Sequence, residues 1–323
     1  MALRHASPSI PDVLAHHENG AALCVLASGS SGNCSALVLR RGMVVRVVLI
    51  DLGLSARRTF KLLADRGLRP DQIDDAIVTH LDSDHFHASW LSAMPGHVRI
   101  RMHHRHERQL RLTCPEGADR LHTFDVDPVD IDEGVTVRPH LMSHDEAGVS
   151  TLRIDMPGLG AGTLGFCTDL GHITNDLIEH LRADVGTGEG GGGGSGGGVD
   201  VLAIESNYCP RMQLASSRPE FLKRRIMGGS GHLSNQEALD AVRSVSPREH
   251  VVLLHLSRDC NDPALVADLH AGSDYALTIA TQYLPTRWIR IARGERPLDR
   301  PLDRALVSAR VMGTRSLWSA ERA

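Results

Sequence analysis

The segment 79–87 of this chain concentrates side chains that bind metal ions. Its histidines and aspartates are His80, Asp82, Asp84, His85 and His87. In an extended or tightly turned segment, His80 and Asp82 point to one side while Asp84 and His85 can turn to another. This spacing predicts two cations a few ångströms apart, each held by one pair. The alternative is a polar loop in which Asp84 caps the following helix, but capping loops rarely gather so many imidazoles and carboxylates.

Further candidate ligands follow apolar, strand-like runs in other parts of the chain. His144, Asp169 and His255 each come directly or shortly after such a run, as the segment 79–87 itself follows the run 76–78. Open mixed sheets hold their ligands at the ends of strands. We therefore expect these side chains to meet at one edge of a sheet.

The periodicity of apolar residues predicts a mixed sheet structure with helices outside. Strands are expected at 23–27, 36–39, 44–50, 76–78, 135–140, 151–155, 164–167, 201–204, 250–254 and 276–281. Helices are expected at 55–66, 175–182, 219–226, 234–245 and 263–270. Ser55 is a candidate N-cap, and Ser234 with Glu237 forms a candidate capping box.

The length of 323 residues allows about two domains, but motifs from distant parts of the chain indicate one shared site. We expect a mobile N-terminal tail at 1–20, one globular domain at 21–290 and a C-terminal extension at 291–323. The segment 186–198 is almost all glycine. Such a run behaves as flexible coil, so it is interpreted as an insertion within the domain.

Composition excludes several classes of protein. No apolar run is long enough to span a membrane, and the N-terminus lacks the apolar core of a secretory signal. The six cysteines are scattered and indicate reduced thiols, which favours a cytoplasmic protein. The formal charge of −4 does not indicate a general nucleic-acid binder, and 3% aromatic residues argue against a base-stacking platform.

Two segments are nevertheless basic. For 99–111 a solvated helix face is the default interpretation, and a rim that faces phosphates near the metals is the alternative. His103, His104 and His106 in this segment are left out of the metal site, because their spacing is a weak signal. The second basic segment is the expected helix 219–226, with Lys223, Arg224 and Arg225.

The segment 28–33 (SGSSGN) permits a tight turn whose backbone N–H groups converge. A nest for an anion and a plain hairpin turn are both open for this segment.

The series HxDxDH with a later His, an Asp and a final His resembles the metallo-β-lactamase fold superfamily, whose pattern is HxHxDH. Four further motifs resemble the WalJ/YycJ group of bacterial hydrolases, which is associated with DNA exonuclease activity. These motifs are SGSSGN at 28–33, IESN at 204–207, GHLSN at 231–235 and HLS at 255–257. The resemblance extends from about residue 23 to residue 270.

This resemblance implies an α/β fold, an αββα four-layer sandwich of mixed sheets with outer helices, with two divalent metal ions in a cleft at the sheet edges. His80, Asp82 and His144 would hold one ion. A second ion would be held by Asp84, His85 and His255, and Asp169 would bridge the two. Asp82 stands where the superfamily usually has a histidine. Because a carboxylate favours a harder ion, zinc and manganese are both candidates, and iron is a third.

The expected chemistry is hydrolysis by a hydroxide that bridges the two metals. Asp84 is expected to act as ligand and as proton acceptor. His232 is the candidate that protonates the leaving oxygen or holds a phosphate, with a structural role at the start of a helix as its alternative. Glu205 and Asn207 are candidates for fixing the ligand imidazoles, or for plain structural hydrogen bonds.

The favoured function is a metal-dependent phosphodiesterase, a DNA exonuclease with DNA as its substrate. A small-molecule hydrolase that opens a lactone, a thioester or a β-lactam would use the same metal site. Iron-based redox chemistry would need a flavin domain for which no segment remains. An inactive binding module is disfavoured by the complete set of ligands.

Overall fold

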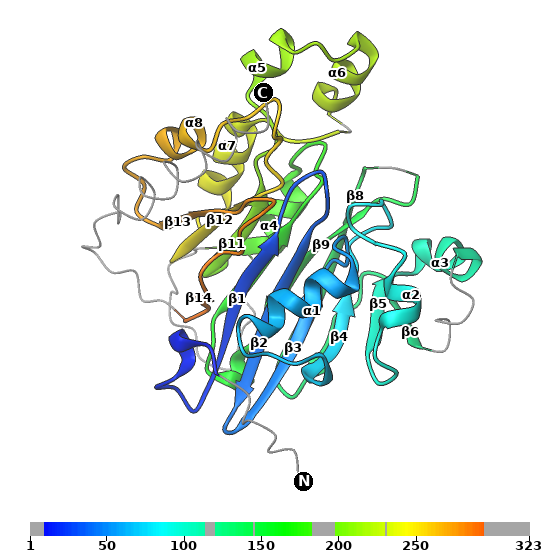
Figure 1. Cartoon of the computed structure of the whole chain (residues 1–323). Coiled ribbons are helices and arrows are strands. Elements are labelled where there is room, and N and C mark those ends of the chain that lie inside the picture. The colour runs from blue at the N-terminus through cyan, green and yellow to red at the C-terminus, as the bar shows by residue number, and fades with distance from the viewer. Residues whose placement is uncertain (1–9, 114–119, 145, 183–197, 230, 294–323) are drawn as a thin grey trace.

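A computed structural model shows two packed β-sheets with helices on their outer faces (Figure 1). It describes residues 10–113, 120–144, 146–182, 198–229 and 231–293. The predicted glycine-rich insertion therefore lies outside the described residues except for Gly198, and so does the predicted C-terminal extension beyond residue 293. The α/β sandwich expected from the sequence is confirmed.

Each sheet has seven strands. The N-terminal sheet has the order β14-β1-β2-β3-β4-β5-β6. Its strands are β1 (Asn19–Ala27), β2 (Cys34–Arg41), β3 (Val44–Ile50), β4 (Ile73–Ile77), β5 (Arg99–His103), β6 (Leu121–Phe124) and β14 (Ile289–Arg290). The C-terminal sheet has the order β13-β12-β11-β10-β9-β8-β7. Its strands are β7 (Val129–Asp132), β8 (Val135–Met142), β9 (Val149–Asp155), β10 (Thr163–Cys167), β11 (Val201–Glu205), β12 (His250–Leu254) and β13 (Ala276–Ile279).

The described helices cover the outer faces or extend the loops between strands. They are α1 (Ala56–Ala64), α2 (Trp90–Ala93), α3 (Glu107–Thr113), α4 (Asn175–Arg182), α5 (Pro210–Ala215), α6 (Glu220–Met227), α7 (Asn235–Val245) and α8 (Pro263–Leu269). Ser55 caps α1 by accepting the Arg58 N–H, and Ser234 with Glu237 forms a complete capping box at α7. Both caps were predicted from the sequence, and both are confirmed.

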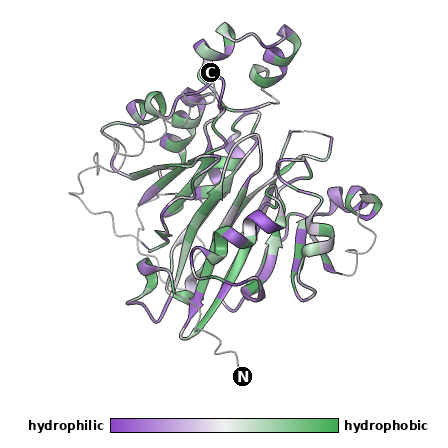
Figure 2. Cartoon of the chain, viewed as in Figure 1, coloured by the Kyte–Doolittle hydropathy of each residue, from purple (hydrophilic) through white to green (hydrophobic). Residues whose placement is uncertain are grey.

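Three clusters of buried apolar side chains separate the layers. One lies between the sheets, where Leu23 and Leu37 of the N-terminal sheet share a cluster with Ile154 and Val252 of the C-terminal sheet. A second cluster lies under α1, and a third lies under α4, α7 and α8. Figure 2 shows mostly hydrophobic strands in both sheets and hydrophilic stretches on the outer helices. Because burial of apolar area drives folding, these clusters fix how the two sheets face each other.

Parallel pairing brings several strand ends to one edge. In the N-terminal sheet β3, β4 and β5 are parallel, and in the C-terminal sheet β10, β11 and β12 are parallel. The carboxyl ends of neighbouring parallel strands lie at the same edge of a sheet. The loops that carry the candidate ligands therefore converge, as the sequence predicted.

Two expectations about the chain are wrong in part. Residues 10–20 were expected to belong to a mobile tail, but a 3-10 helix at Asp12–Leu14 places the Leu14 side chain in the core, without exposed surface. The basic segment 99–111 was expected to be a helix face throughout, but its first part is the buried strand β5. Strand β5 tolerates its arginines because Arg99 and Arg101 both contact the buried Asp75 carboxylate at 2.6 Å.

Among the described helices, none has the length and the hydrophobicity that crossing a membrane requires. The five cysteines within the described residues are free thiols, as expected, and Cys114 lies outside them.

Candidate metal centre

Three residues at strand ends adopt a backbone conformation that is unusual for residues other than glycine. Asp51, Asp169 and His255 have φ angles of 61°, 54° and 54°. Asp51 directly follows β3, His255 directly follows β12, and Asp169 lies two residues after the end of β10. Non-glycine residues with positive φ are uncommon and concentrate at functional sites. Ser246 is the one other such residue in the part of the chain that the structure describes. The strain thus marks one place in the molecule.

The loop that follows β4 carries His80, Asp82, Asp84 and His85 in a tight turn. The backbone N–H groups of His85 and Phe86 both donate to the carbonyl of Asp82, at 2.8 Å. The next helix, α2, begins only at Trp90. Asp84 is therefore not its N-cap, and the alternative interpretation of this segment as a helix-capping loop is excluded.

A glycine beneath the loop permits its position. A Cβ atom at Gly53 would lie 1.7 Å from the carbonyl oxygen of Asp84. The backbone N–H of Asn33 donates to the same carbonyl at 2.7 Å. The loop therefore rests directly on backbone, and no other residue type at position 53 would leave room for it.

The first group of candidate ligands comes together as the sequence predicted. Asp82 Oδ2 lies 3.8 Å from His80 Nε2 and 3.7 Å from His144 Nε2. Their ligand atoms all lie within 4.8 Å of one another. His80 and Asp82 come from the loop after β4, and His144 comes from the loop after β8.

The tautomer of His80 fits a metal ligand. Thr79 Oγ donates to Asp51 at 2.8 Å, so it can accept from His80 Nδ1, 3.0 Å away. The proton is thus on Nδ1, and Nε2 carries a free lone pair. This Nε2 is buried and has no hydrogen-bond partner among the described residues. Burial, and next to it the neighbouring His85, lower the pKa of His80 to about 4, so the ring is neutral near pH 7.

The second group of candidate ligands is Asp84, His85 and His255. Asp84 Oδ2 lies 3.2 Å from His255 Nε2 and 3.8 Å from His85 Nε2. Asp169 lies beside this group, with 2.8 Å from Oδ2 to His85 Nε2 and 3.6 Å from Oδ1 to His255 Nε2. Asp169 also forms a group of possible ligands with His80 and His85. It is thus the carboxylate between the two groups, where a bridging ligand is expected.

The charges of this centre balance one another at close range. Burial raises the pKa of Asp169, but the nearby rings of His255 and His85 outweigh burial and hold that pKa well below its usual value. Burial likewise lowers the pKa of His85, and the carboxylates of Asp169 and Asp51 raise it well above its usual value. Carboxylates and imidazoles at this density are typical of a site for divalent cations.

Asp51 is a functional residue that the sequence interpretation missed. Its buried carboxylate accepts the Thr79 N–H and the Thr79 hydroxyl at 2.8 Å, and it lies 2.7 Å from His85 Nδ1. One carboxylate therefore fixes the ring of His85 directly and the ring of His80 through Thr79. The signal in the sequence was the position of Asp51 immediately after a predicted strand.

The predicted partner Asn207 lies at His255. Its Nδ2 is 2.9 Å from His255 Nδ1 and donates to the His255 carbonyl at 2.8 Å. In this orientation His255 Nδ1 accepts, so its Nε2 carries the proton. A metal at Nε2 requires the proton on Nδ1, and the Asn207 amide nitrogen would then have to leave Nδ1, since turning the amide over would place its oxygen against the His255 carbonyl oxygen.

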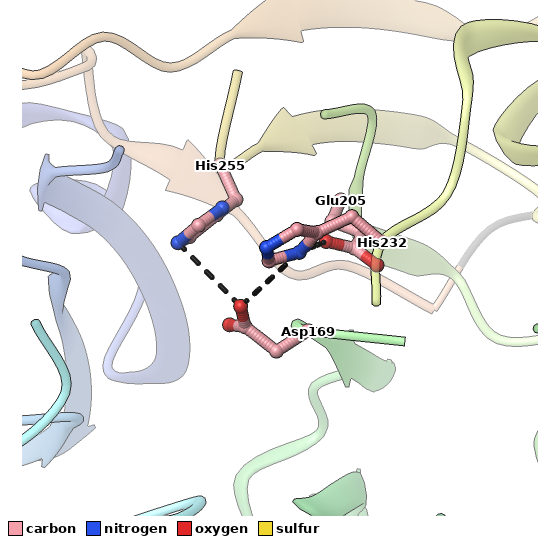
Figure 3. Close-up of side chains that lie close together, drawn as sticks. All are labelled: Asp169, Glu205, His232 and His255. Carbon is pink, nitrogen blue, oxygen red and sulfur yellow. Dashed lines mark hydrogen bonds and ion pairs between the residues drawn. The ribbon is translucent and has the colours of Figure 1, made fainter. Parts of the chain in front are cut away.

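Glu205 and His232 stand beside the carboxylate of Asp169 (Figure 3). Glu205 Oε1 accepts the backbone N–H groups of Leu170 and Leu233, at 2.6 and 3.1 Å. His232 Nδ1 lies 3.1 Å from Glu205 Oε2 and 3.4 Å from Asp169 Oδ1. Because the cap of α7 is Ser234, the structural alternative for His232 as a helix cap is wrong. Glu205 thus orients the ring that we consider as a proton donor.

The turn at 28–33 supports the loop that follows β4 and does not form an open nest for an anion. Asn33 Oδ1 accepts from the Ser28 hydroxyl and the Gly29 N–H, at 3.1 and 2.8 Å. Its Nδ2 lies 3.0 Å from His85 Nε2. The His255 N–H donates to the Ser28 hydroxyl oxygen at 2.8 Å. This turn therefore connects the ligand loops of both sheets.

The remaining histidines of the two motif regions lie outside these groups. His87 is exposed, and its Nδ1 accepts the Ser89 N–H at 3.1 Å. His103 and His104 do form a group with Asp125. However, His103 Nδ1 accepts the backbone N–H of Arg105 at 3.2 Å, which puts the proton on Nε2. A backbone N–H cannot become an acceptor, as a side-chain amide can by rotating, so the proton stays on His103 Nε2. This ring is therefore a poor metal ligand, in agreement with its exclusion from the predicted site.

Comparison with known proteins agrees with this geometry. Residues 31–174 match the model of the metallo-beta-lactamase superfamily. The chain is 25% identical to the exodeoxyribonuclease WalJ of Streptococcus pneumoniae, over 80% of this chain and 93% of that protein. It is 26% identical to the exodeoxyribonuclease YycJ of Bacillus anthracis, over 73% of this chain and 83% of that protein. A crystal structure of a diphosphatase from the PhnP family superposes with a TM-score of 0.55 at 16% identity, covering 84% of this chain and 98% of the other.

Proposed function

We propose that this hydrolase of the metallo-β-lactamase superfamily is a dinuclear metal-dependent phosphodiesterase that degrades DNA as an exonuclease. The observation that carries the proposal is the pair of ligand groups joined by Asp169, with Glu205 and His232 beside them. The names of the two exodeoxyribonuclease relatives support DNA as the substrate.

The ligand set fits divalent cations. His80, His85, His144 and His255 offer imidazoles, and Asp82, Asp84 and Asp169 offer carboxylates. When bound, two such cations would lower the pKa of a shared water and stabilise the charge that develops on a phosphoryl oxygen. The carboxylate at Asp82 favours a harder ion than a third imidazole would, so manganese joins zinc as a candidate, and iron fits the same donors.

The protein residues supply the proton transfers. Asp84 lies between His85 and His255 and is positioned to take the proton of the attacking water. His232 is partly exposed, with 21% of its side chain accessible, so it can reach a substrate while Glu205 holds its Nδ1. A protonated His232 is thus placed to donate a proton to the leaving oxygen.

The test is degradation of five-prime-phosphorylated duplex DNA. Metal-stripped protein would be resupplied separately with manganese, zinc or iron, and Asp84→Ala would serve as the control. We expect metal-dependent loss of nucleotides from one end, which the variant lacks. Absence of cleavage with every ion, together with hydrolysis of a lactone or a thioester, would replace this proposal with a small-molecule hydrolase.

A further inference from the structure

Helices α5 and α6 form a hairpin beyond the strand ends of the C-terminal sheet (Figure 1). This α5–α6 hairpin comprises residues 209–229, between β11 and α7. It contains five basic residues and one acidic residue, whereas the whole chain has a formal charge of −4. The basic residues are Arg211, Arg218, Lys223, Arg224 and Arg225. Positive charge is therefore concentrated in one short insertion of an otherwise acidic protein.

The α5–α6 hairpin is attached directly to the candidate site. Its two ends follow Glu205 and precede His232 in the chain. The His232 N–H donates to the carbonyl of Ile226 at 3.1 Å, and His172 Nδ1 lies 2.8 Å from the carbonyl of Gly229. A small apolar cluster packs Ile226 and its neighbours in the hairpin against Tyr208 and Cys260 outside it. The hairpin is thus a built element that borders the metal centre.

The basic residues of the hairpin fall into two kinds. Lys223 is 8% exposed, and its Nζ donates to the carbonyl of Leu214 at 2.9 Å, which ties α6 to α5. Arg218 contacts Asp259 at 3.2 Å. Both therefore hold the hairpin in place. Arg211 on α5 and Arg224 and Arg225 on α6 are exposed and have no ion pair within the described part of the chain.

The two exposed arginines of α6 share one face of that helix with an exposed aromatic ring. Phe221 precedes Arg224 and Arg225 by three and four residues, so the three side chains lie on the same side of α6. Phe221 is 69% exposed, in a chain with only 3% aromatic residues. A single exposed apolar side chain is common on protein surfaces, so the observation that points to a ligand is the position of this ring beside two arginines that have no ion pair within the described part of the chain.

We propose that the face formed by Phe221, Arg224 and Arg225 binds a single-stranded segment of the nucleic-acid substrate and guides it to the metal centre. This inference rests on the proposed function and adds the substrate-binding element. The guanidinium groups bind phosphates of the backbone, and the ring stacks on a base. An apolar protein partner fits less well, because two charged arginines flank the ring. The acidic residue of α6, Glu220, pairs with Lys223 at 3.1 Å and not with these arginines.

The experiment compares variants on a long and a short substrate. Arg224→Ala/Arg225→Ala, Arg224→Lys/Arg225→Lys and Phe221→Ala would be assayed on a single-stranded oligonucleotide and on bis(p-nitrophenyl) phosphate, which is too small to reach the hairpin. The matched control is Arg57→Ala/Lys61→Ala, which removes two exposed cations from α1.

We expect the double alanine variant to raise KM for the oligonucleotide and to reduce the salt dependence of log KM by about 1.4, since each phosphate contact on a single strand contributes about 0.7. Phe221→Ala should raise the same KM about tenfold, at the lower end of the loss of one stacked base. The lysine variant should keep the salt dependence, because it keeps both charges. The α1 control should leave the oligonucleotide KM unchanged, and kcat and the rate with the small phosphodiester should not change in any of these variants.

Unchanged oligonucleotide KM and salt dependence in an enzyme that does degrade DNA would overturn this inference alone. An equal loss in the α1 control would also overturn it, because the effect would then follow total charge and not this face. A wild-type enzyme that hydrolyses the small phosphodiester but no nucleic acid would overturn the proposed function together with the inference.

Discussion

The two sheets present their ligands in different ways. The N-terminal sheet supplies His80, Asp82, Asp84 and His85 from one loop after β4. The C-terminal sheet supplies one ligand from each of three loops, which follow β8, β10 and β12. One half of the candidate site is therefore a local turn, and the other half exists only where separate strands end together.

The supporting hydrogen bonds differ in the same way. Asp51 alone fixes the rings of His80 and His85, directly or through Thr79. In the C-terminal sheet, Asn207 serves His255 and Glu205 serves His232. One buried carboxylate thus positions two candidate ligands of the N-terminal loop, whereas on the C-terminal side separate residues position His255 and His232.

The largest expected effect comes from Asp51→Asn. The amide oxygen can still accept from Thr79, but the amide nitrogen cannot accept a hydrogen bond from His85 Nδ1. The tautomer of the His85 ring is then no longer fixed. We expect a loss of roughly 10–100-fold in metal affinity. Competition with a coloured chelator measures it. The matched control is Asp71→Asn, whose carboxylate is 64% exposed and pairs with Arg69 on the surface. Equal affinities of the two variants would show that Asp51 does not organise the ligands.

The second prediction concerns Glu205→Gln on the C-terminal side. The Gln oxygen can still accept the N–H groups of Leu170 and Leu233, so the fold and the metal content should be retained. The amide nitrogen then faces His232 Nδ1 and cannot accept its N–H, so the ring is no longer oriented. We expect kcat to fall about tenfold or more, since one acid–base group typically contributes about 10²–10⁴-fold.

A loss of metal in Glu205→Gln equal to that in Asp51→Asn would remove the distinction between the two sides. Metal content measured on the same samples as kcat therefore decides whether Glu205 acts through His232 or through the metal ligands.

The same difference between the two sheets explains which candidate ligands could be predicted from the sequence. The contiguous ligands of the N-terminal loop could be recognised from their spacing, because residues 80–85 meet without tertiary structure. His144, Asp169 and His255 could be assigned only through the resemblance to a family, since their separation in the chain says nothing about distance. Asp51 was missed for the same reason, as it lies 28 residues before Thr79.

The errors in the fold also have a tertiary cause. The segment 99–103 has the composition of a solvated helix, yet it pairs as β5 between β4 and β6. Its arginines remain there because they contact Asp75 on the neighbouring strand. Local composition could not show this, because the partner is 24 residues away in the chain. Tertiary ion pairs thus override the propensity of a basic segment.

The smallest expected effect comes from Asp82→His, which makes the first ligand group resemble the usual superfamily pattern. Asp82 is the most exposed residue of its group, with 48% of its side chain accessible, so the substitution should not disturb the core. Three imidazoles in place of two and a carboxylate form a softer site, which raises the ratio of bound zinc to bound manganese. The ratio is measured after equilibration of metal-free protein with equal concentrations of both ions, with Asp71→His as the control for an added surface histidine. If the ratio stays as in the wild type, Asp82 does not touch the metal, and the N-terminal loop contributes fewer ligands than its spacing predicts.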